Sequence, residues 1–239
     1  MAKENILSEL LREGAEKIGI FLSSEKIEKF FIYLEQLKLW NEKVNLTAIK
    51  RDKEIIVKHF LDSLTCYLIM DKDATNLVDI GSGAGFPSLP LKILLPEIKC
   101  TLIEARKKKV TFLHHLVRKL ELKNVTLING RAEEIARGER RESFDVAVGR
   151  AVAGLNVLAE YALPYVKVGG CFIVQKGSQV KQLKKARNAF LLLGGRVERI
   201  KKINLPFLNQ ERNLILVRKV GPTPLKYPRR PGIPEKNPL

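Results

Sequence analysis

Cysteine is scarce in this sequence. Cys66, Cys100 and Cys171 are its three cysteines among 239 residues; each stands in an apolar stretch, and no two form a C-x-x-C pair. A disulfide framework needs an even and denser set of cysteines, and a zinc site needs closely paired ligands. The sequence therefore indicates neither, and we expect no structural metal.

Long apolar runs are missing as well. No uninterrupted apolar stretch approaches the length that spans a bilayer, and the opening residues Met1-Ala-Lys-Glu-Asn-Ile lack the apolar centre of a secretory signal. We expect a cytoplasmic protein with no membrane segment.

Acidic residues are few compared with basic ones. The chain has 26 Asp and Glu against 43 Lys and Arg, which gives a formal net charge of +17. This excess is larger than solubility requires and favours a polyanionic partner, most simply a nucleic acid. A basic protein whose lysines are merely solvated is the alternative.

The chain divides into three parts by pattern. Residues 1–70 have apolar residues at helical spacing and no parallel-strand pattern, so they are interpreted as a helical extension. Residues 71–220 alternate strand and helix patterns, which is typical of an α/β sheet domain. Residues 221–239 hold six of the eleven prolines with several basic residues. Such a tail cannot build its own core, but it can lie over a surface and contact phosphates; a plain solvated tail is the alternative.

Residues 76–90 carry the most informative pattern, a short apolar strand followed by a glycine loop and a helix start. The loop has Gly81, Gly83 and Gly85 after Asp79, and Phe86 stands where a G-x-G-x-x-G dinucleotide motif needs its last glycine. It contains no lysine, which excludes the G-x-x-x-x-G-K-[ST] phosphate loop. An acidic residue before the loop repels a pyrophosphate but attracts a cation. The pattern thus favours a ligand with a nucleoside and a positive centre, such as S-adenosylmethionine, over a plain tight turn.

Later strand ends place further residues near the same crevice, because the carboxyl ends of parallel strands converge. Glu104 ends the second strand and is placed to accept hydrogen bonds from ribose hydroxyls. Ala132 and Glu133 follow the third strand, where an adenine edge would lie. Arg150 follows the fourth strand and points into the crevice or pairs with a carboxylate.

The sequence leaves the roles of two clusters of polar residues open. His59, Asp62 and Ser63 share one helix face, and three neighbours on one helix cannot form a catalytic triad in line with a substrate; they are either a hydrogen-bonded interface or a polar edge of a pocket. The basic run from Arg106 to Lys109 opens a helix, where it opposes the helix dipole, so it either contacts phosphate or is a solvated face.

These motifs resemble the RsmG (GidB) methyltransferases. The resemblance runs from about residue 40 to the end, in family order, through Trp40-Asn-Glu-Lys-Val-Asn-Leu-Thr-Ala-Ile, His59-Phe-Leu-Asp-Ser-Leu, Asp79-Ile-Gly-Ser-Gly-Ala-Gly-Phe-Pro-Ser-Leu-Pro-Leu, Gly130-Arg-Ala-Glu-Glu, Gly149-Arg-Ala, Lys176-Gly and Tyr227-Pro-Arg-Arg-Pro-Gly-Ile-Pro-Glu-Lys-Asn-Pro-Leu. One departure is Ser88, where many members have glycine. The resemblance implies a class I S-adenosylmethionine-dependent methyltransferase: a Rossmann-like α/β fold with a mostly parallel seven-stranded sheet, an antiparallel edge strand and the N-terminal helical extension.

The family's activity, the methylation of guanine N7 in 16S ribosomal RNA of the bacterial small subunit, is what the resemblance implies for this chain. The partner is then 16S rRNA or the small subunit, and a monomer is expected. The expected cofactor contacts are Asp79, Gly81, Gly83, Phe86, Glu104, Ala132, Glu133 and Arg150. The residues expected to contact RNA are Asn45, His59, Lys107, Lys108, Tyr227, Arg229, Arg230 and Lys236.

The expected chemistry needs no general base. The chain has neither the (D/N/S)-P-P-(Y/F) motif of amine methyltransferases nor a Pro-Cys nucleophile after the fourth strand. Guanine N7 has an unprotonated lone pair in the ring plane, so positioning suffices, with Arg150 and Lys176 holding phosphate or the guanine O6 edge. A methyltransferase acting on another RNA, a protein or a small molecule, and a non-enzymatic RNA-binding assembly factor, are the alternatives.

Overall fold

The structure is a computed structural model that describes residues 2–150, 154–177, 181–208 and 210–239. Its centre is a seven-stranded sheet of order β3-β2-β1-β4-β5-β7-β6. The strands are β1 Asn76–Ile80, β2 Lys99–Glu104, β3 Val125–Asn129, β4 Phe144–Gly149, β5 Val166–Lys176, β6 Gly195–Asn204 and β7 Glu211–Lys219.

Strands β1 to β5 pair in parallel, whereas β7 runs antiparallel to both β5 and β6. The predicted mostly parallel sheet is confirmed. The last strand, β7, lies between β5 and β6, so the antiparallel strand is next to the edge of the sheet and β6 is the outermost strand.

Alternate residues of the strands feed two separate cores, because successive side chains point to opposite faces of a sheet. In β1 and β4, Leu77 and Val146 belong to the core on one face, whereas Val78 and Ala147 belong to the core on the other. The continuous apolar runs of these strands are therefore explained by burial on both faces.

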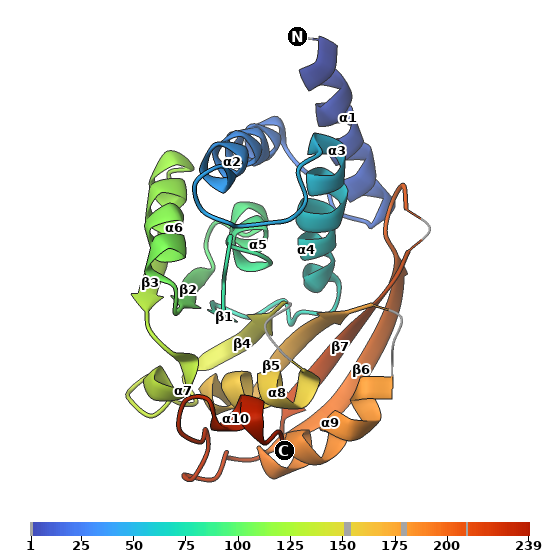
Figure 1. The fold of residues 1–239 in the computed structure, drawn as a ribbon. Coiled ribbons are helices and arrows are strands. Elements are labelled where there is room, and N and C mark those ends of the chain that lie inside the picture. Colours follow the sequence, from blue (N-terminus) through green and yellow to red (C-terminus); the bar gives the residue numbers. More distant parts are fainter. Residues whose placement is uncertain (1, 151–153, 178–180, 209) are drawn as a thin grey trace.

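Helices cover each face, as Figure 1 shows. On one side lie α1 Ala2–Lys17, α2 Ser24–Asn41, a helical segment from 52 to 68, α5 Ser88–Leu94 and α6 Lys107–Lys119. On the other lie α7 Ala132–Ile135, α8 Leu155–Ala162 and α9 Lys181–Leu192. None of the helices in the described ranges combines the length and apolar character that crossing a membrane requires.

The segment from 52 to 68 is helical, as the pattern of the extension predicts, but it changes helix type three times. It consists of α3 Asp52–Ile55, the π-helical η1 Ile56–Leu61, α4 Asp62–Leu64 and the 3₁₀ turn η2 Thr65–Leu68. π-helical turns are rare and frequently mark functional sites. His59 lies within this one.

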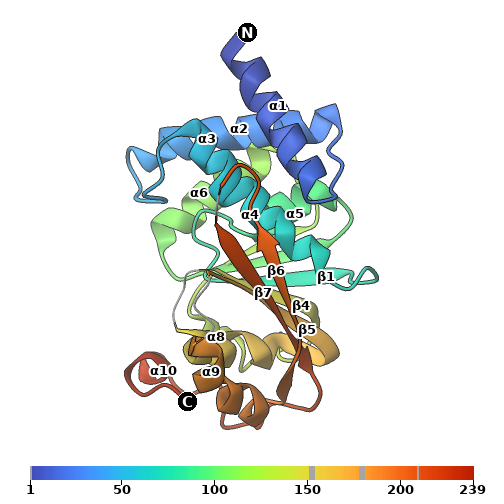
Figure 2. The same ribbon diagram turned by 90° about the vertical axis from the view of Figure 1, so that its right-hand side faces the viewer.

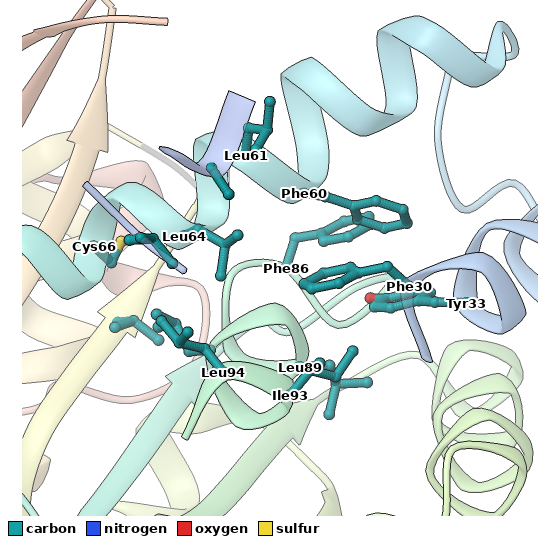
Figure 3. Packing of buried hydrophobic residues seen from close by; sticks show 14 of the residues in the cluster. Phe30, Tyr33, Phe60, Leu61, Leu64, Cys66, Phe86, Leu89, Ile93 and Leu94 are labelled. Atoms are coloured by element: carbon teal, nitrogen blue, oxygen red, sulfur yellow. The ribbon is translucent and has the colours of Figure 1, made fainter. Parts of the chain in front are cut away.

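The N-terminal helices share a core with the sheet. Figure 3 shows the rings of Phe30, Tyr33, Phe60 and Phe86 close together, joining α2, η1 and the glycine loop. Tyr33 stacks on Phe86 with ring centroids 5.3 Å apart, and its hydroxyl donates to the Ala84 carbonyl at 2.5 Å. The glycine loop is thus fixed from the helical side. The division at residues 70 and 220 into separate units stays a prediction.

The C-terminal tail is folded onto the sheet domain. It ends in the short helix α10 Ile233–Lys236, which lies beside α8 in both Figure 1 and Figure 2. Arg137 donates to the Pro228 carbonyl at 2.9 Å, and Arg141 donates to the Tyr227 carbonyl at 2.8 Å. Cations of the sheet domain therefore satisfy backbone acceptors of the tail.

An ion pair anchors the same tail. The Arg229 guanidinium donates to both carboxylate oxygens of Glu160 at 2.6 to 3.2 Å, and the Arg229 backbone N–H adds a bond at 2.8 Å. The Glu160 side chain is fully buried and that of Arg229 is 21% exposed. Removal of the arginine would leave a buried carboxylate without its cation, which is costly.

We therefore expect Arg229→Ala to lower the free energy of unfolding by about 2 to 3 kcal/mol, the range for breaking a largely buried pair that is partly solvated. Arg230→Ala, at the exposed neighbouring position, is the matched control and should change it by less than about 0.5 kcal/mol. Urea unfolding measures both. Equal stability of the two variants would show that the Glu160 pair does not hold the tail.

Candidate cofactor and active site

A cavity of about 420 Å³ opens where the parallel strands end. Its wall is built by the segments that follow β1, β2, β3 and β4, by the loop at residues 46–47, and by side chains of η1, α8 and α10. The predicted residues Gly81, Gly83, Phe86, Glu104, Ala132, Glu133 and Arg150 all lie in this wall, together with His59. The convergence expected from the sequence is therefore present.

The glycines of the loop serve different structural purposes: Gly85 permits close packing, and Gly83 leaves the backbone accessible. Gly81, Gly83 and Gly85 all have positive φ, of 69°, 59° and 93°. A Cβ on Gly85 would lie 2.7 Å from both Leu89 and the Tyr33 hydroxyl, so this glycine permits close packing. A Cβ on Gly83 would meet nothing nearer than 3.8 Å. Gly83 thus leaves its side of the wall open for a ligand to approach the backbone.

Asp79 lies behind the loop. It is fully buried in β1 and is not among the cavity-lining residues. Its Oδ2 accepts the Ser88 hydroxyl at 2.5 Å, whereas its Oδ1 has no hydrogen-bond partner among the described residues. Burial raises the pKa of this carboxyl to about 7, against the hydrogen bonds from Ser88. Direct contact with a cofactor stays a prediction, and the position indicates support of the loop from behind.

Glu104 holds the loop from the neighbouring strand. Its Oε2 accepts the Gly83 N–H at 2.9 Å, and its Oε1 accepts the Arg106 N–H at 2.8 Å. The carboxylate is 7% exposed and lines the cavity. It thus presents acceptor oxygens in fixed positions, which suits ribose hydroxyls.

Ala132 and Glu133 begin α7 in the cavity wall. The Ala132 carbonyl accepts the Tyr165 hydroxyl at 2.6 Å, which fixes the start of this helix. Glu133 is 2% exposed, and its Oε1 has no hydrogen-bond partner among the described residues. A buried unpaired acceptor in a ligand cavity is where a ligand donor, such as an adenine amino group, would bind.

Arg150 joins β4 to the π-helical segment. Its guanidinium donates to the Lys58 carbonyl at 3.1 Å, to Asp62 Oδ2 at 3.4 Å and to His59 Nδ1 at 2.9 Å. It also lies 4.9 Å from the centre of the Phe86 ring. Arg150 therefore both lines the cavity and pairs with a carboxylate, the two roles considered from the sequence. Ala151, which follows it in the motif, lies outside the described residues.

The His59 ring is held in one tautomer. A guanidinium has only donors, so Nδ1 must be the acceptor, and Nε2 carries the proton that it donates to Thr47 Oγ1 at 2.7 Å. Burial and the Arg150 charge lower the pKa of His59 to about 3. The ring stacks on Phe86 with centroids 4.5 Å apart. A neutral His59 contributes shape and hydrogen bonds, not charge, to any RNA contact.

Both alternatives considered from the sequence are present. Asp62 and Ser63 belong to a hydrogen-bonded interface, whereas His59 lies at the polar edge of the cavity. Ser63 donates to the His59 carbonyl at 2.5 Å, and Asp62 also pairs with Arg212 at 3.3 Å. No serine–histidine–carboxylate relay exists among these three side chains.

Apart from His59, which lines the cavity, the residues predicted to contact RNA lie in three places. Asn45 is exposed next to Leu46 and Thr47 of the cavity wall, in a loop held by Asn41. Lys107 and Lys108 are exposed at the start of α6. In the tail, Arg230 and Lys236 are exposed, Tyr227 is buried and Arg229 is paired. Lys176 is half-buried and absent from the cavity lining, and burial lowers its pKa. All these contacts stay predictions.

Several cavity residues were not predicted: Thr47, Arg106, Lys109, Arg131, Tyr161 and Glu235. Lys109 and Arg106 belong to the basic run already noted, and Thr47 to the Asn-Leu-Thr motif, so a signal existed for these three. Arg131 and Glu235 also lie in motifs quoted above, whereas nothing near Tyr161 in the sequence indicates the cavity. Among the residues that the structure describes, no group of three or more His, Cys, Asp and Glu side chains is arranged to hold a metal.

The strand order and a cavity at the carboxyl ends of the parallel strands define a class I S-adenosylmethionine-dependent methyltransferase fold. The chain is similar in fold to a SAM-dependent methyltransferase from Aquifex aeolicus, with a TM-score of 0.52 and 16% identity over 68% of this chain and 92% of that chain. It is likewise similar to M. jannaschii TYW2 in complex with AdoMet, with a TM-score of 0.53 and 13% identity over 66% of this chain and 75% of that one.

Sequence comparison gives the family. The model of the family described as rRNA small subunit methyltransferase G matches residues 26–220. A relative from Acetivibrio thermocellus named ribosomal RNA small subunit methyltransferase G is 48% identical over 239 residues, covering 99% of this chain and 98% of the relative. The chain therefore belongs to the rRNA small subunit methyltransferase G family, and the resemblance found in its motifs is confirmed.

The buried Asp79–Ser88 pair gives a pH-dependent prediction. Because burial raises the pKa of Asp79 in the folded protein to about 7, its contribution to stability is fully present below the unfolded pKa of about 4 and is lost as pH rises through about 7. Ser88→Ala removes one donor to the ionised form. We expect it to cost about 2 kcal/mol at about pH 8 and about 1 kcal/mol at about pH 5, in urea unfolding.

The control for this effect is the same serine change in an Asp79→Asn background. There the cost should not vary with pH, because position 79 no longer titrates. A cost for Ser88→Ala alone that is constant between the two pH values would contradict the assignment.

The lowered pKa of His59 gives a second prediction. Between about pH 3 and the unfolded pKa of about 6.5, the unfolded chain binds a proton that folded His59 does not, so its contribution to stability falls as pH falls. We expect ring-nitrogen NMR to show Nδ1 of His59 unprotonated from pH 8 to pH 5, with the proton on Nε2. The urea-unfolded chain, in which the nitrogen titrates normally, is the control. Protonation of Nδ1 in the folded protein within this range would refute the tautomer.

Proposed function

We propose that this protein methylates ribosomal RNA of the bacterial small subunit, with S-adenosylmethionine as the methyl donor. The observation that carries the proposal is the 48% identity, over nearly the full length, to a relative named ribosomal RNA small subunit methyltransferase G. The cavity at the ends of the parallel strands is where a methyltransferase of this fold binds its cofactor. The finer assignment, to guanine N7 of 16S rRNA, rests on the resemblance of its motifs to the family. The place of action would be the cytoplasm, where ribosomal subunits are found.

The cavity residues suit this cofactor. Gly81 and Gly83 allow close approach to the backbone, Glu104 offers acceptors for ribose hydroxyls, and the unpaired Oε1 of Glu133 is a site for an amino group. S-adenosylmethionine, when bound, supplies an electrophilic methyl group on a sulfonium centre. Phe86, His59 and Arg150 form the part of the wall beside the N-terminal helices, which we assign to the methyl-donor end and the incoming base.

The residues around that end favour transfer without a general base. His59 is neutral, and hydrogen bonds occupy both its ring nitrogens. The three cysteines are buried, and burial raises the pKa of each thiol, so none is a ready nucleophile. An unprotonated ring nitrogen such as guanine N7 needs only alignment with the methyl group. We assign the alignment to Arg150, held rigid by Asp62 and His59, and retain Lys176 as a second positioning residue.

The RNA would approach along the basic rim of the cavity. Arg106 and Lys109 line the cavity, and Lys107 and Lys108 are exposed beside them at the start of α6. With a net charge of +17, binding should be driven largely by phosphate neutralisation. We further propose that residues 1–70 form a helical extension of the catalytic domain. The enzyme would act on the small subunit as a monomer.

Labelled S-adenosylmethionine tests it, with three acceptors from cells that lack the gene: intact small subunits, deproteinised 16S RNA and large subunits. We expect label in small-subunit RNA, mapped as N7-methylguanosine and lost steeply as salt rises. Cofactor binding with no label in any of the three RNAs would overturn the proposal and favour a protein acceptor or a binding role.

Glu104 gives a prediction for the cofactor alone. Glu104→Gln removes the charge from an acceptor that also holds Gly83, and hydrogen bonds to charged groups are worth about 1.5 to 3 kcal/mol. We expect affinity for S-adenosylmethionine to fall by about 10- to 100-fold in calorimetry. Glu97→Gln, at an exposed position outside the cavity lining, is the control and should bind as the unaltered protein does. Equal affinity of the two variants would remove Glu104 from the cofactor site.

A further inference from the structure

The C-terminal helix α10 reaches the cofactor cavity. Glu235, in the middle of this helix, is part of the cavity wall together with Glu133 of α7 and Tyr161 of α8. These three residues lie about 30 and 70 positions apart along the chain, so only folding of the tail brings them together. The tail, which the sequence predicts to contact RNA, thus contributes a carboxylate to the cavity that we assign to the cofactor.

We propose that the tail is a wall of the cofactor site and that Glu235 selects the nucleobase, accepting a hydrogen bond from the exocyclic amino group of adenine. The inference rests on the proposed function, because it assumes that the cavity binds a nucleoside-containing methyl donor. It goes beyond that function by assigning a specificity role to the tail.

The tail is held firmly enough for this role. Arg229 pairs with Glu160, which is the residue immediately before Tyr161 on α8. The same turn of α8 therefore fixes the tail through one side chain and lines the cavity through the next. At the far end, Asn156 of α8 donates to the backbone carbonyl of Leu239 at 2.9 Å. Helix α10 is thus tied to α8 on both sides.

Glu133 and Tyr161 each have a polar atom without a hydrogen-bond partner among the described residues at this end of the cavity. These atoms, Glu133 Oε1 and the Tyr161 hydroxyl, are buried. Burial raises the pKa of the Tyr161 hydroxyl, and the nearby Glu133 and Glu235 carboxylates add to this shift. Two carboxylates that face one cavity favour a ligand that brings N–H groups. The amino group of adenine has two, whereas hypoxanthine presents a carbonyl oxygen at the same position, which the carboxylates would repel.

The experiment compares two nucleosides that differ at this one atom. S-Adenosylhomocysteine and S-inosylhomocysteine are titrated calorimetrically into the full-length protein and its variants. We expect the unaltered protein to bind the adenosyl compound at least about tenfold more tightly, since a site built to accept an N–H rejects an analogue that lacks it. Glu235→Gln, whose amide offers a donor to the inosine oxygen, should reduce this ratio at least about fivefold.

Glu134→Gln is the matched control, because Glu134 neighbours Glu133 on α7 but is exposed and does not line the cavity. It should keep both affinities, and all variants should unfold at the same temperature. An unchanged ratio in Glu235→Gln, or equal weakening of both compounds, would overturn the selective role while leaving the proposed function intact. Failure of the unaltered protein to bind either compound would instead count against the proposed function.

Discussion

The site depends on the hydrogen bonds of the guanidinium of Arg150, whose side chain is 15% exposed. This side chain leaves the end of β4 and reaches the backbone and two side chains of the π-helical and α4 segments, as well as the face of the Phe86 ring. A buried cation is costly unless it is paired and fully hydrogen-bonded, so these partners must stay in place for the fold to be stable. The helical extension, the sheet and the glycine loop are therefore coupled at one point. The π-helical turn supplies both the Lys58 carbonyl and the His59 ring nitrogen to this one guanidinium.

The same coupling explains why a neutral histidine stands in the wall of a site for a cationic cofactor and an anionic RNA. Arg150 fixes His59 as an acceptor on one side and Thr47 fixes it as a donor on the other. The ring then stacks on Phe86, which stacks in turn on Tyr33. A protonated His59 would face the Arg150 charge directly, and the pKa of about 3 reflects this repulsion added to burial. Burial, reinforced by the cation beside the ring, thus keeps His59 and the aromatic wall uncharged.

The sequence was sufficient for those parts of the fold and site that depend on local pattern. The strands of the parallel sheet are short apolar runs, and the strand ends carry Glu104, Ala132, Glu133 and Arg150 into one cavity by topology alone. Asp79 follows the same logic in sequence, but it lies within the strand, one residue before its end, and the structure buries it behind the loop. Thr47 and Glu235 lie in recognisable motifs, but their place in the cavity wall, like that of Tyr161, depends on how a loop, the tail and a helix pack in three dimensions. The changes of helix type between residues 52 and 68 could not be predicted either, because the apolar spacing of this segment fits a regular α-helix.

The tail shows why net charge alone assigns no surface. A basic, proline-rich segment is compatible with an arm that contacts phosphates, yet the fold already uses much of the basic charge on and around it. Arg229 neutralises Glu160, Arg137 and Arg141 bind tail carbonyls, and Lys219 donates to Glu142 and to two backbone carbonyls in the interior. Glu160 and Glu142 neutralise Arg229 and Lys219, so these two cations add little to the field that an RNA meets, whereas Arg137 and Arg141 bind neutral carbonyls and keep their charge. Lys107 and Lys108 differ from these cations, because they are exposed and lie between Arg106 and Lys109, which line the cavity. The charge that matters for a polyanion is the fraction that the fold leaves at that rim, whereas the tail contributes Glu235 to the wall of the cavity.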